Sequence, residues 1–376
     1  MKAGTALIAG SALYAAGAFV LARALRQMPS APEVPSEALP RAAVLVAARN
    51  EAHTIRRCLT ALRAQAYPAG RLEIVVADDA SSDDTARLAR EAGQGPGHPV
   101  TVLSLDEPPP GSALRGKARA LHAALGASNA PLLLVTDADC APPPRWAARM
   151  AAAFAADPGL GLVGGLTTID ARPGHTLDAL QARDWAWLLG GTAALAALGR
   201  PVTAMGNNMA FRREAYDAVG GYPALRFSVT EDYALLRAVQ DRSHWRVGFS
   251  AEPDTTVKTL GLDSPGAVFR QRLRWMRGGL KASPAVMAGG TAVFALHAGI
   301  AGGLAARVPE AAGAAALKAF GDHLLAHRGF ASRTGAVTRK AQISALHLLT
   351  TLIYIPLSVP GLIMRMDAIW KGRRVA

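Results

Sequence analysis

Residues 132–140 read LLLVTDADC, in which five apolar or β-branched residues run directly into two aspartates, Asp137 and Asp139. Two carboxylates at the end of a buried strand repel each other and lose hydration unless a cation lies between them. Residues two apart in an extended backbone point to the same side. The pattern therefore predicts a divalent cation, Mg²⁺ or Mn²⁺, because these ions prefer hard oxygen ligands.

This stretch belongs to an alternation of strand and helix patterns. Apolar runs typical of strands occupy residues 41–51, 71–79, 98–105 and 131–137. The segments between them, 53–65, 81–92 and 116–127, have the pattern of helices. The strands are continuous hydrophobic runs, which is typical of a parallel sheet covered on both faces. We therefore expect an α/β fold.

Polar side chains stand at the ends of the predicted strands, where ligands of parallel sheets bind. No GxGxxG follows the first strand, so a dinucleotide-dependent hydride-transfer enzyme loses support. Carboxylates at this place instead accept hydrogen bonds from a nucleobase or a ribose. Ser81 and Asp84 have the spacing of a capping box for the next helix. The polar residues expected beside the ligand are Arg49, Asn50, Glu51, Asp78, Asp79, Asp137 and Asp139.

Three segments, 3–22, 282–306 and 341–364, lack charged residues over the length of a membrane span. The first is expected to be an uncleaved anchor, because its apolar run is longer than that of a signal peptide and no cysteine-stapled domain follows. The second is poor in Leu and Ile, and it is left open between a transmembrane helix and a re-entrant or interfacial segment. The third is stronger and precedes the basic tail KGRR.

The distribution of charge predicts an orientation. Arg23 and Arg26 follow the first segment and basic residues follow the last, so the positive-inside rule places the central domain in the cytoplasm of a multi-pass protein of the cell (inner) membrane. The loop 307–340 is also basic, which conflicts with three simple spans. Such loops account for the net charge of +13, and nucleic acid is not expected as a partner. Cys58 and Cys140 show neither disulfide nor zinc spacing.

The order of motifs along the chain is more specific than any one of them. AARNE, VVADDASSDDT, GKARAL, LLLVTDADC, MGNNMAFRREAYDAVGGY, VTEDYAL and QRLRW follow one another between residues 47 and 275. This set resembles the membrane-bound family 2 glycosyltransferases, over roughly residues 41–281. The resemblance implies an A-type glycosyltransferase fold with a mostly parallel central sheet and with transmembrane helices near both ends of the chain. It also implies a nucleotide-sugar donor, a divalent metal and inversion at the anomeric carbon.

The resemblance also implies roles for single residues. Asp78 and Asp79 resemble the nucleoside-binding acids, and Lys117 resembles the residue near the nucleotide. Asp137 and Asp139 match the DxD motif, of which Asp139 resembles the member that contacts the metal. Asp232 resembles the catalytic base, with Glu231 as a supporting or capping acid. The remaining expected residues are Arg49 and Glu51 on the donor side, Asn207 and Asn208 on the acceptor side, and Gln271, Arg274 and Trp275 of QxxRW against donor and acceptor.

Physical chemistry is consistent with these roles. An inverting transfer is one displacement, which needs one base and neutralisation of the leaving diphosphate. A helix N-terminus would lower the pKa of Asp232 unless burial raises it. Lys117 at a helix start is best explained by an approaching anion. Residues 184–199 are expected to form an interfacial helix, and Arg270, Arg272 and Arg277 are expected to meet anionic headgroups.

These inferences predict a membrane-anchored, non-processive, inverting glycosyltransferase of lipid or cell-envelope glycan synthesis. Its donor is expected to be a nucleotide sugar, with a UDP-sugar favoured, and its acceptor a hydroxyl of a lipid or lipid-linked molecule. Two alternatives stay open. The first is a subunit of a processive polysaccharide synthase. The second is a catalytically inactive membrane protein that binds nucleotide sugars.

Overall fold

The computed structural model describes residues 3–109, 111–225, 228, 230–279, 284–335, 345–353, 355, 369–370 and 373–374. The chain folds into two compact units. Unit 1 comprises Met1–Met28, Thr168–Val202 and Gly261–Met366, and unit 2 comprises Pro29–Thr167, Thr203–Leu260 and Asp367–Ala376. The polypeptide therefore leaves unit 1 after its first helix and returns to it twice.

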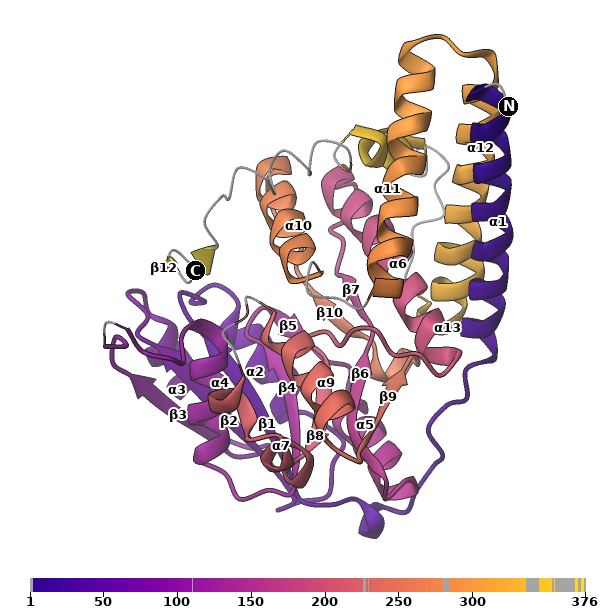
Figure 1. Cartoon of the computed structure of the whole chain (residues 1–376). Coiled ribbons are helices and arrows are strands. Elements are labelled where there is room, and N and C mark those ends of the chain that lie inside the picture. Colours follow the sequence, from indigo (N-terminus) through magenta and orange to yellow (C-terminus); the bar gives the residue numbers. More distant parts are fainter. Residues whose placement is uncertain are drawn as a thin grey trace. The chain divides into compact units, whose positions relative to one another are not determined.

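Unit 2 is built on a seven-stranded sheet in the order β3-β2-β1-β4-β8-β6-β9 (Figure 1). Neighbouring strands are parallel except at β8, which runs antiparallel to both β4 and β6. The mostly parallel sheet that the apolar runs predict is thus confirmed. The strands are β1 (Ala42–Ala48), β2 (Leu72–Asp79), β3 (Val100–Leu105), β4 (Leu132–Asp137), β6 (Leu160–Gly165), β8 (Met209–Arg212) and β9 (Arg246–Ser250).

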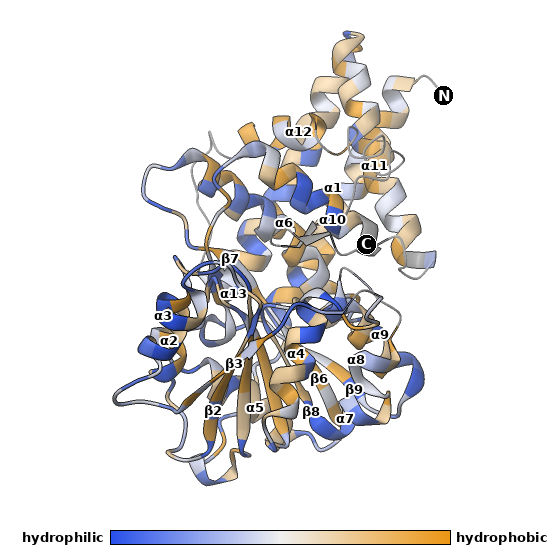
Figure 2. Ribbon diagram, turned by 90° about the vertical axis from the view of Figure 1, so that its left-hand side faces the viewer, coloured by the Kyte–Doolittle hydropathy of each residue, from blue (hydrophilic) through white to orange (hydrophobic). Residues whose placement is uncertain are grey.

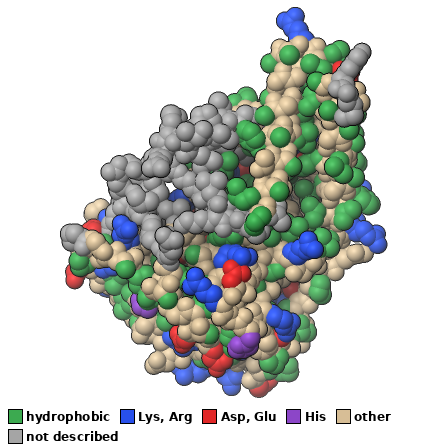
Figure 3. Space-filling model, in the orientation of Figure 1, with side chains coloured by type: hydrophobic (Ala, Val, Ile, Leu, Met, Phe, Trp, Pro, Cys, Tyr) green, Lys and Arg blue, Asp and Glu red, His purple; other side chains and the backbone are tan. Residues whose placement is uncertain are grey.

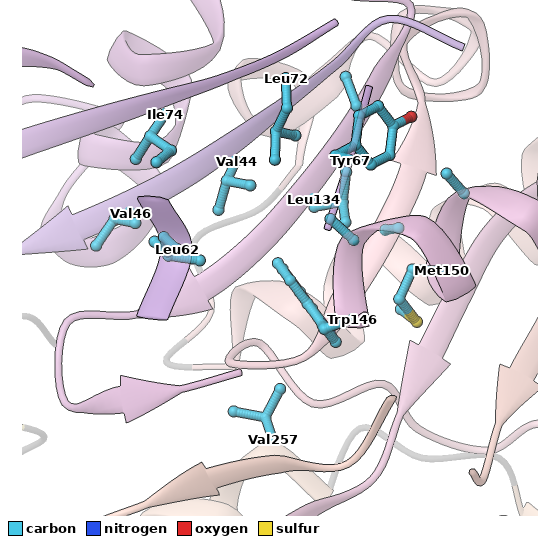
Figure 4. Close-up of a cluster of buried hydrophobic side chains, with 14 of the residues drawn as sticks. Val44, Val46, Leu62, Tyr67, Leu72, Ile74, Leu134, Trp146, Met150 and Val257 are labelled. Carbon is cyan, nitrogen blue, oxygen red and sulfur yellow. The ribbon is translucent and has the colours of Figure 1, made fainter. Parts of the chain in front are cut away.

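Helices cover both faces of this sheet, and successive residues of each strand alternate between two hydrophobic cores. Val44 and Val46 point into the core beneath α2, α3 and α5, where Figure 4 shows them with Leu134 and Trp146. Leu45 points into the opposite core beneath α4 and α9. Every residue of β1 is buried, which explains why its sequence shows no polar alternation. The orange strands between bluer helices in Figure 2 show the same distribution of hydropathy.

Shorter elements complete unit 2. Strand β5 (Cys140–Ala141) pairs antiparallel with β10 (Val257–Thr259), directly after the DxD sequence. Strand β11 (Ile369–Trp370) pairs with β12 (Arg373–Arg374). The helices are η1 (Ser36–Ala38), α2 (Ile55–Arg63), α3 (Thr85–Ala92), α4 (Gly116–Gly126), α5 (Trp146–Ala156), α7 (Arg213–Ala218), α8 (Gly221–Ala224), α9 (Glu231–Arg242) and η2 (Pro253–Thr255).

The regular structure that is described in unit 1 is helical, apart from part of the short strand β7 (Thr167–Ile169), at which the chain passes from unit 2. Two of its helices are long and apolar enough to cross a membrane, Ala3–Gln27 and Val286–Ala305. Hydrophobic side chains cover much of the helical surface seen in Figure 3. The helices are α1 (Ala3–Gln27), α6 (Thr176–Ala197), α10 (Pro265–Gly279), α11 (Pro284–Ala305), α12 (Pro309–His323), the π-helix η3 (Leu324–Ala331) and α13 (Ser332–Thr334).

The predicted spans 3–22 and 282–306 fall largely within α1 and α11. Of the predicted span 341–364, residues 345–353 are helical, and most of the remainder lies outside the described residues. The basic stretch 307–340, which connects the second and third predicted spans, contains α12, η3 and α13 up to Thr334. Small and apolar residues such as Ala311, Ala314 and Phe330 form a buried face among its basic residues.

Residues 184–199 belong to a longer helix than predicted, α6, which packs against α1 and η3. Trp185 and Trp187 are buried within unit 1, so the expected interfacial position is wrong for these two side chains. Trp187 Nε1 donates a hydrogen bond to the hydroxyl of Tyr14 at 2.7 Å. The indoles that suggested an interface therefore serve contacts between helices.

A buried ion pair within α12 is hydrogen-bonded to α1. Lys318 is fully buried, and its Nζ lies 2.6 Å from Asp322 Oδ2. The hydroxyl of Tyr14 donates to the other oxygen of Asp322 at 2.7 Å. The ammonium also lies 5.1 Å from the centre of the Trp187 ring, which allows a cation–π interaction. Each polar atom that this pair removes from water is thus provided with a partner.

Candidate active site

Lys117 connects the acids that gather at the carboxyl edge of the sheet in unit 2. Its Nζ lies 2.6 Å from Asp137 Oδ1 and 3.3 Å from Glu231 Oε1. The same atom donates to the carbonyl oxygen of Gly206 at 2.8 Å. Burial alone would lower the pKa of this ammonium, but the surrounding carboxylates raise it well above its ordinary value. Lys117 is therefore a permanent cation that holds the end of β4 against the start of α9.

Asp232, the second residue of α9, lies against the same group. Its Oδ2 accepts a hydrogen bond from the backbone N–H of Gly206 at 2.6 Å, and its Oδ1 accepts from the N–H of Tyr233 at 2.7 Å. Burial, followed by the negative charge of Glu231, raises the pKa of Asp232 to about 7, although Lys117 and the two N–H groups oppose this rise. Burial thus overcomes the effect expected of a helix N-terminus. A carboxyl that titrates near neutral pH is suited to general base catalysis.

Two buried acids end the neighbouring strand β2. Asp79 is completely buried and forms an ion pair with Arg119 of α4, while its backbone carbonyl accepts a hydrogen bond from Arg49. Asp78 accepts a hydrogen bond from the hydroxyl of Ser81. The two carboxylates therefore face different partners, although they are adjacent in sequence.

The turn after β2 differs from the predicted capping box. Ser81 binds Asp78. Asp84, at the N-cap position of α3, accepts hydrogen bonds from the side chain of Arg87, and its side chain makes no capping bond to a backbone N–H of the helix. Asp83 accepts from the N–H of Thr85 at 3.0 Å instead. The capping box was wrong because α3 begins after Asp84, and the hydroxyl oxygen of Ser81 accepts from the N–H of Asn50 in place of a helix N–H.

The polar residues after β1 form a compact turn against this segment. Asn50 has a left-handed backbone, with φ of 54°, a conformation that asparagine tolerates better than most residues. Its side-chain oxygen accepts from the N–H of Ser82 at 2.9 Å. Glu51 is buried and accepts from the hydroxyl of Thr54 at 2.8 Å, and its own N–H donates to Thr85 at 2.7 Å. The turn thus brings Arg49 and Glu51 beside the acids of β2.

Asp137 and Asp139 are both half-buried, and Asp137 is already paired with Lys117. Asp139 Oδ1 lies 3.4 Å from the thiol of Cys140, a weak donor. Within the part of the chain that the structure describes, no three His, Cys, Asp or Glu side chains converge as a metal site. The two carboxylates fit a hard divalent cation that takes its other ligands from a diphosphate and water.

The asparagines expected on the acceptor side have different environments. Asn208 is completely buried; its Oδ1 accepts from Trp146 Nε1 at 2.9 Å, and its Nδ2 donates to the carbonyls of Leu166 and Thr255. Both donor positions are used within the fold, so the structure gives Asn208 a packing role in place of an acceptor contact. Asn207 is 8% exposed and accepts from Thr167 at 2.9 Å.

The comparison with protein families decides the class of the enzyme. A family model described as "Glycosyltransferase like family 2" matches residues 40–278, which is more than half of the chain. The chain belongs to glycosyltransferase family 2. The glycosyltransferase expected from the ordered motifs is therefore confirmed at the level of the family.

Individual relatives of this glycosyltransferase are distant. It is 28% identical over 258 residues to the probable glycosyltransferase YdaM of Bacillus subtilis, covering 64% of this chain and 55% of the relative. It is 28% identical over 274 residues to the β-monoglucosyldiacylglycerol synthase of Synechocystis sp., covering 68% and 53% respectively. The chain thus spans about half the length of these curated relatives.

A solved structure supports the fold. The mannosyltransferase from Pyrobaculum calidifontis, in complex with GDP-Man and Mn²⁺, matches 97% of this chain and 99% of its own with a TM-score of 0.62 and 23% identity. The match confirms the A-type glycosyltransferase fold expected from the sequence.

The QxxRW residues of the glycosyltransferase lie in unit 1, on α10. Gln271, Arg274 and Trp275 are all half-buried. Arg272, expected to face headgroups, is 4% exposed and forms an ion pair with Asp184 of α6. Its guanidinium also lies 4.4 Å from the centre of the Trp275 ring. The expectation for Arg272 was wrong because a buried acid on another helix of unit 1 was not identifiable from the arginine's local sequence.

Two site residues were missed by sequence reasoning. Arg119 neutralises Asp79, and its position two residues after Lys117 in GKARAL was the available signal. Gly206 supplies both the N–H to Asp232 and the carbonyl to Lys117. A Cβ added at Gly206 would lie 2.9 Å from both of those side chains, which explains a glycine there.

Proposed function

We propose that this family 2 glycosyltransferase is a membrane-anchored, non-processive enzyme that transfers a sugar from a nucleotide sugar, with a UDP-sugar favoured, to a hydroxyl of a lipid acceptor with inversion. The observation that carries the proposal is Asp232, whose carboxylate has a pKa near 7 and is held by the N–H of Gly206 beside Lys117. One such base is sufficient for an inverting displacement.

The residues divide the reaction between them. Asp232 accepts the proton of the acceptor hydroxyl as its oxygen attacks the anomeric carbon, and the bond from that carbon to the leaving diphosphate breaks. Glu231 keeps the pKa of Asp232 raised, and Lys117 fixes the position of the acids. This arrangement orients the base before the substrate arrives.

The donor is proposed to occupy the edge formed by the ends of β1, β2 and β4. Asp78 and Asp79, with Arg49 and Glu51 beside them, are proposed for the nucleoside. Asp137 and Asp139 would hold the divalent metal, with Asp139 as its principal ligand. When bound, Mg²⁺ or Mn²⁺ neutralises the negative charge of the leaving diphosphate. The similar mannosyltransferase was solved with GDP-Man and Mn²⁺, which supports this assignment.

A lipid acceptor is supported by two observations. The similar protein of Synechocystis is named β-monoglucosyldiacylglycerol synthase, which is the name of an enzyme that makes a glycolipid. Two helices of unit 1 are long and apolar enough to cross a membrane. We propose a multi-pass protein of the inner membrane with a cytoplasmic catalytic unit. Asn207, Gln271, Arg274 and Trp275 are the residues proposed for acceptor and diphosphate contacts.

The test is a screen of nucleotide sugars with total membrane lipid, using the full chain in detergent. We expect one donor to give a glycolipid product. The enzyme should lose this activity with EDTA and regain it with Mg²⁺ or Mn²⁺. Polymer products would establish a processive synthase instead. Binding of donor with neither transfer nor hydrolysis would establish an inactive binding protein. Transfer to soluble sugars alone, with every lipid extract ignored, would exclude the lipid acceptor.

A further inference from the structure

Unit 1 contains a cavity with a basic lining. Its volume is about 470 Å³, and its lining residues are Arg26, His323, His327, Arg328, Ala331 and Ser332. These residues come from α1 and from three helices that follow one another in the chain, α12, η3 and α13. The volume lies within the roughly 300–1,000 Å³ typical of small-molecule sites. The cavity is therefore large enough for a small charged group.

The lining carries positive charge without a carboxylate among the described residues. Arg26 and Arg328 are permanent cations, and the rings of His323 and His327 lie 4.5 Å apart. The adjacent acid, Asp322, is engaged elsewhere by Lys318 and Tyr14. Arg26, His323 and Arg328 are exposed in this open pocket, so water screens the repulsion between the two guanidinium groups. An anion between the two arginines would accept charge-assisted hydrogen bonds from both.

Arg183 of α6 provides an independent observation. It is 1% exposed, and neither its Nε nor its Nη1 has a hydrogen-bond partner among the described residues. It lies close enough to His323 that burial, then the charges of Arg183 and Arg328, lower the pKa of that imidazole. Burial lowers the pKa of the Arg183 guanidinium, and the nearby carboxylate of Asp322 opposes this shift only in part. Two of its buried N–H groups therefore remain available to a further acceptor.

The π-helix offers a further structural reason. Helix η3 presents His327 and Arg328 from a π-helical segment, Leu324–Ala331. Such segments are rare and are found frequently at functional sites. The arginines at this cavity belong to the end of α1 and to η3, which are far apart in the sequence and are brought together by the packing of these two helices.

We propose that this cavity is a binding site for a phosphate group, held by Arg26 and Arg328 and supported by His323 and His327, with the charge of Arg183 nearby. Arginine recognises phosphate by paired, charge-assisted hydrogen bonds. The phosphate belongs either to a phospholipid headgroup, since Arg26 lies in the last turn of the apolar helix α1, or to a soluble phosphate.

The experiment measures thermal unfolding of the full chain in a non-ionic detergent. Phosphatidylglycerol and inorganic phosphate are added in separate series, and the apparent Kd is taken from the dependence of Tm on concentration. We expect at least one probe to raise Tm. A response to the lipid alone identifies a headgroup as the source, and a response to inorganic phosphate identifies a soluble anion. No rise with either probe overturns the proposal.

Matched variants separate the site from general attraction. The double variant Arg26→Gln with Arg328→Gln should weaken binding about tenfold or more. Arg23→Gln with Arg307→Gln removes the same charge from exposed positions outside the cavity lining and should change the Kd less than twofold. Equal weakening by both pairs would mean non-specific electrostatics and would refute the proposal.

Arg183→Met gives a second, independent readout. Removal of a buried guanidinium with two unused N–H donors should raise the Tm of the ligand-free protein and also weaken phosphate binding. A fall in the ligand-free Tm, together with unchanged binding, would show that Arg183 already has its partner and does not serve this site. Asp232→Asn should retain phosphate binding, so failure of the transferase assignment and failure of this site are distinguishable.

Discussion

Replacement of Asp232 by asparagine tests the proposed base, and its consequences follow from the geometry. The carboxylate accepts from the N–H groups of Gly206 and Tyr233, and an amide can accept only one of these bonds through its single oxygen. The variant keeps the size of the side chain and removes the proton acceptor. Loss of a general base lowers kcat by about 10²–10⁴-fold. We therefore expect transfer to fall by at least a hundredfold.

The pH dependence of the parent enzyme follows from the same residue. A base with a pKa of about 7 must be deprotonated to act, so kcat/KM should rise about tenfold per pH unit below 7 and level off above it. The assay is transfer of radiolabelled sugar between pH 5 and pH 9. The residual activity of Asp232→Asn should lose this dependence.

Stability should change in the opposite direction. The folded pKa of Asp232 lies above the unfolded one, so folding takes up a proton, and the free energy of unfolding decreases as pH rises from about 4 to about 7. Above pH 7 the ionised Asp232 lowers the free energy of unfolding by at most about 4 kcal/mol. Asparagine removes this penalty but loses one hydrogen bond, which costs about 1 kcal/mol. Asp232→Asn should thus gain stability relative to the parent at pH 8 and not at pH 4.

Asp241→Asn is the matched control, because Asp241 lies on the same helix and is half-exposed beside Arg237. It should keep the parent rate and pH profile. If Asp232→Asn transferred sugar at the parent rate, or if the pH profile were unchanged in the variant, the assignment of the base would be refuted.

Three further changes test the remaining contacts. Lys117→Met leaves the acids around it without their cation and should destabilise the protein by about 3 kcal/mol at pH 8, measured by urea unfolding. Gly206→Ala introduces a Cβ 2.9 Å from Asp232 Oδ2 and should lower kcat more than tenfold, measured in the transfer assay, with a smaller effect on Tm. Lys318→Met and Asp322→Leu should each destabilise unit 1 by about 3–5 kcal/mol, and the double variant should lose less than their sum in a double-mutant cycle of thermal unfolding.

Each of these changes has a control or a contrary outcome. Lys258→Met removes an exposed lysine and should change stability by less than about 0.5 kcal/mol. Gly126→Ala adds a methyl group where no other atom lies within 4 Å, and it should leave kcat unaltered. Additive losses at Lys318 and Asp322 would show that the two side chains are not energetically coupled.

Much of unit 2 could be predicted because its signals are local. The continuous apolar runs, the helical spacing between them and the acids at strand ends each occupy one short segment, and the order of motifs placed the chain in its family. The capping box at Ser81 failed, although it is local as well, because the hydroxyl oxygen of Ser81 accepts from the N–H of Asn50 and the N–H of Ser81 donates to Asp78. A spacing rule identifies a possible bond and does not rank it against neighbours in space.

The less predictable features depend on residues that are distant in sequence. Arg272 was expected to meet headgroups because its helix is basic, yet it is buried in an ion pair with Asp184 of another helix. Asn208 looked like a polar ligand contact, and only the positions of Leu166 and Thr255 show that its amide is used internally. In both cases the role of the side chain depends on a partner that is distant in the sequence, so the residues around it could not predict that partner.

The sequence alone was sufficient for the α/β alternation and the glycosyltransferase class, because both depend on residue types and short spacings. Only the tertiary structure showed that Asp232 combines a raised pKa with a contact to Gly206 and with Lys117 as its neighbour. It also showed a buried Lys318 and a basic cavity that Arg26 of α1 forms with residues between His323 and Ser332. The physical reason is that desolvation and Coulomb interactions depend on distances between segments, and those distances exist only after the chain has packed.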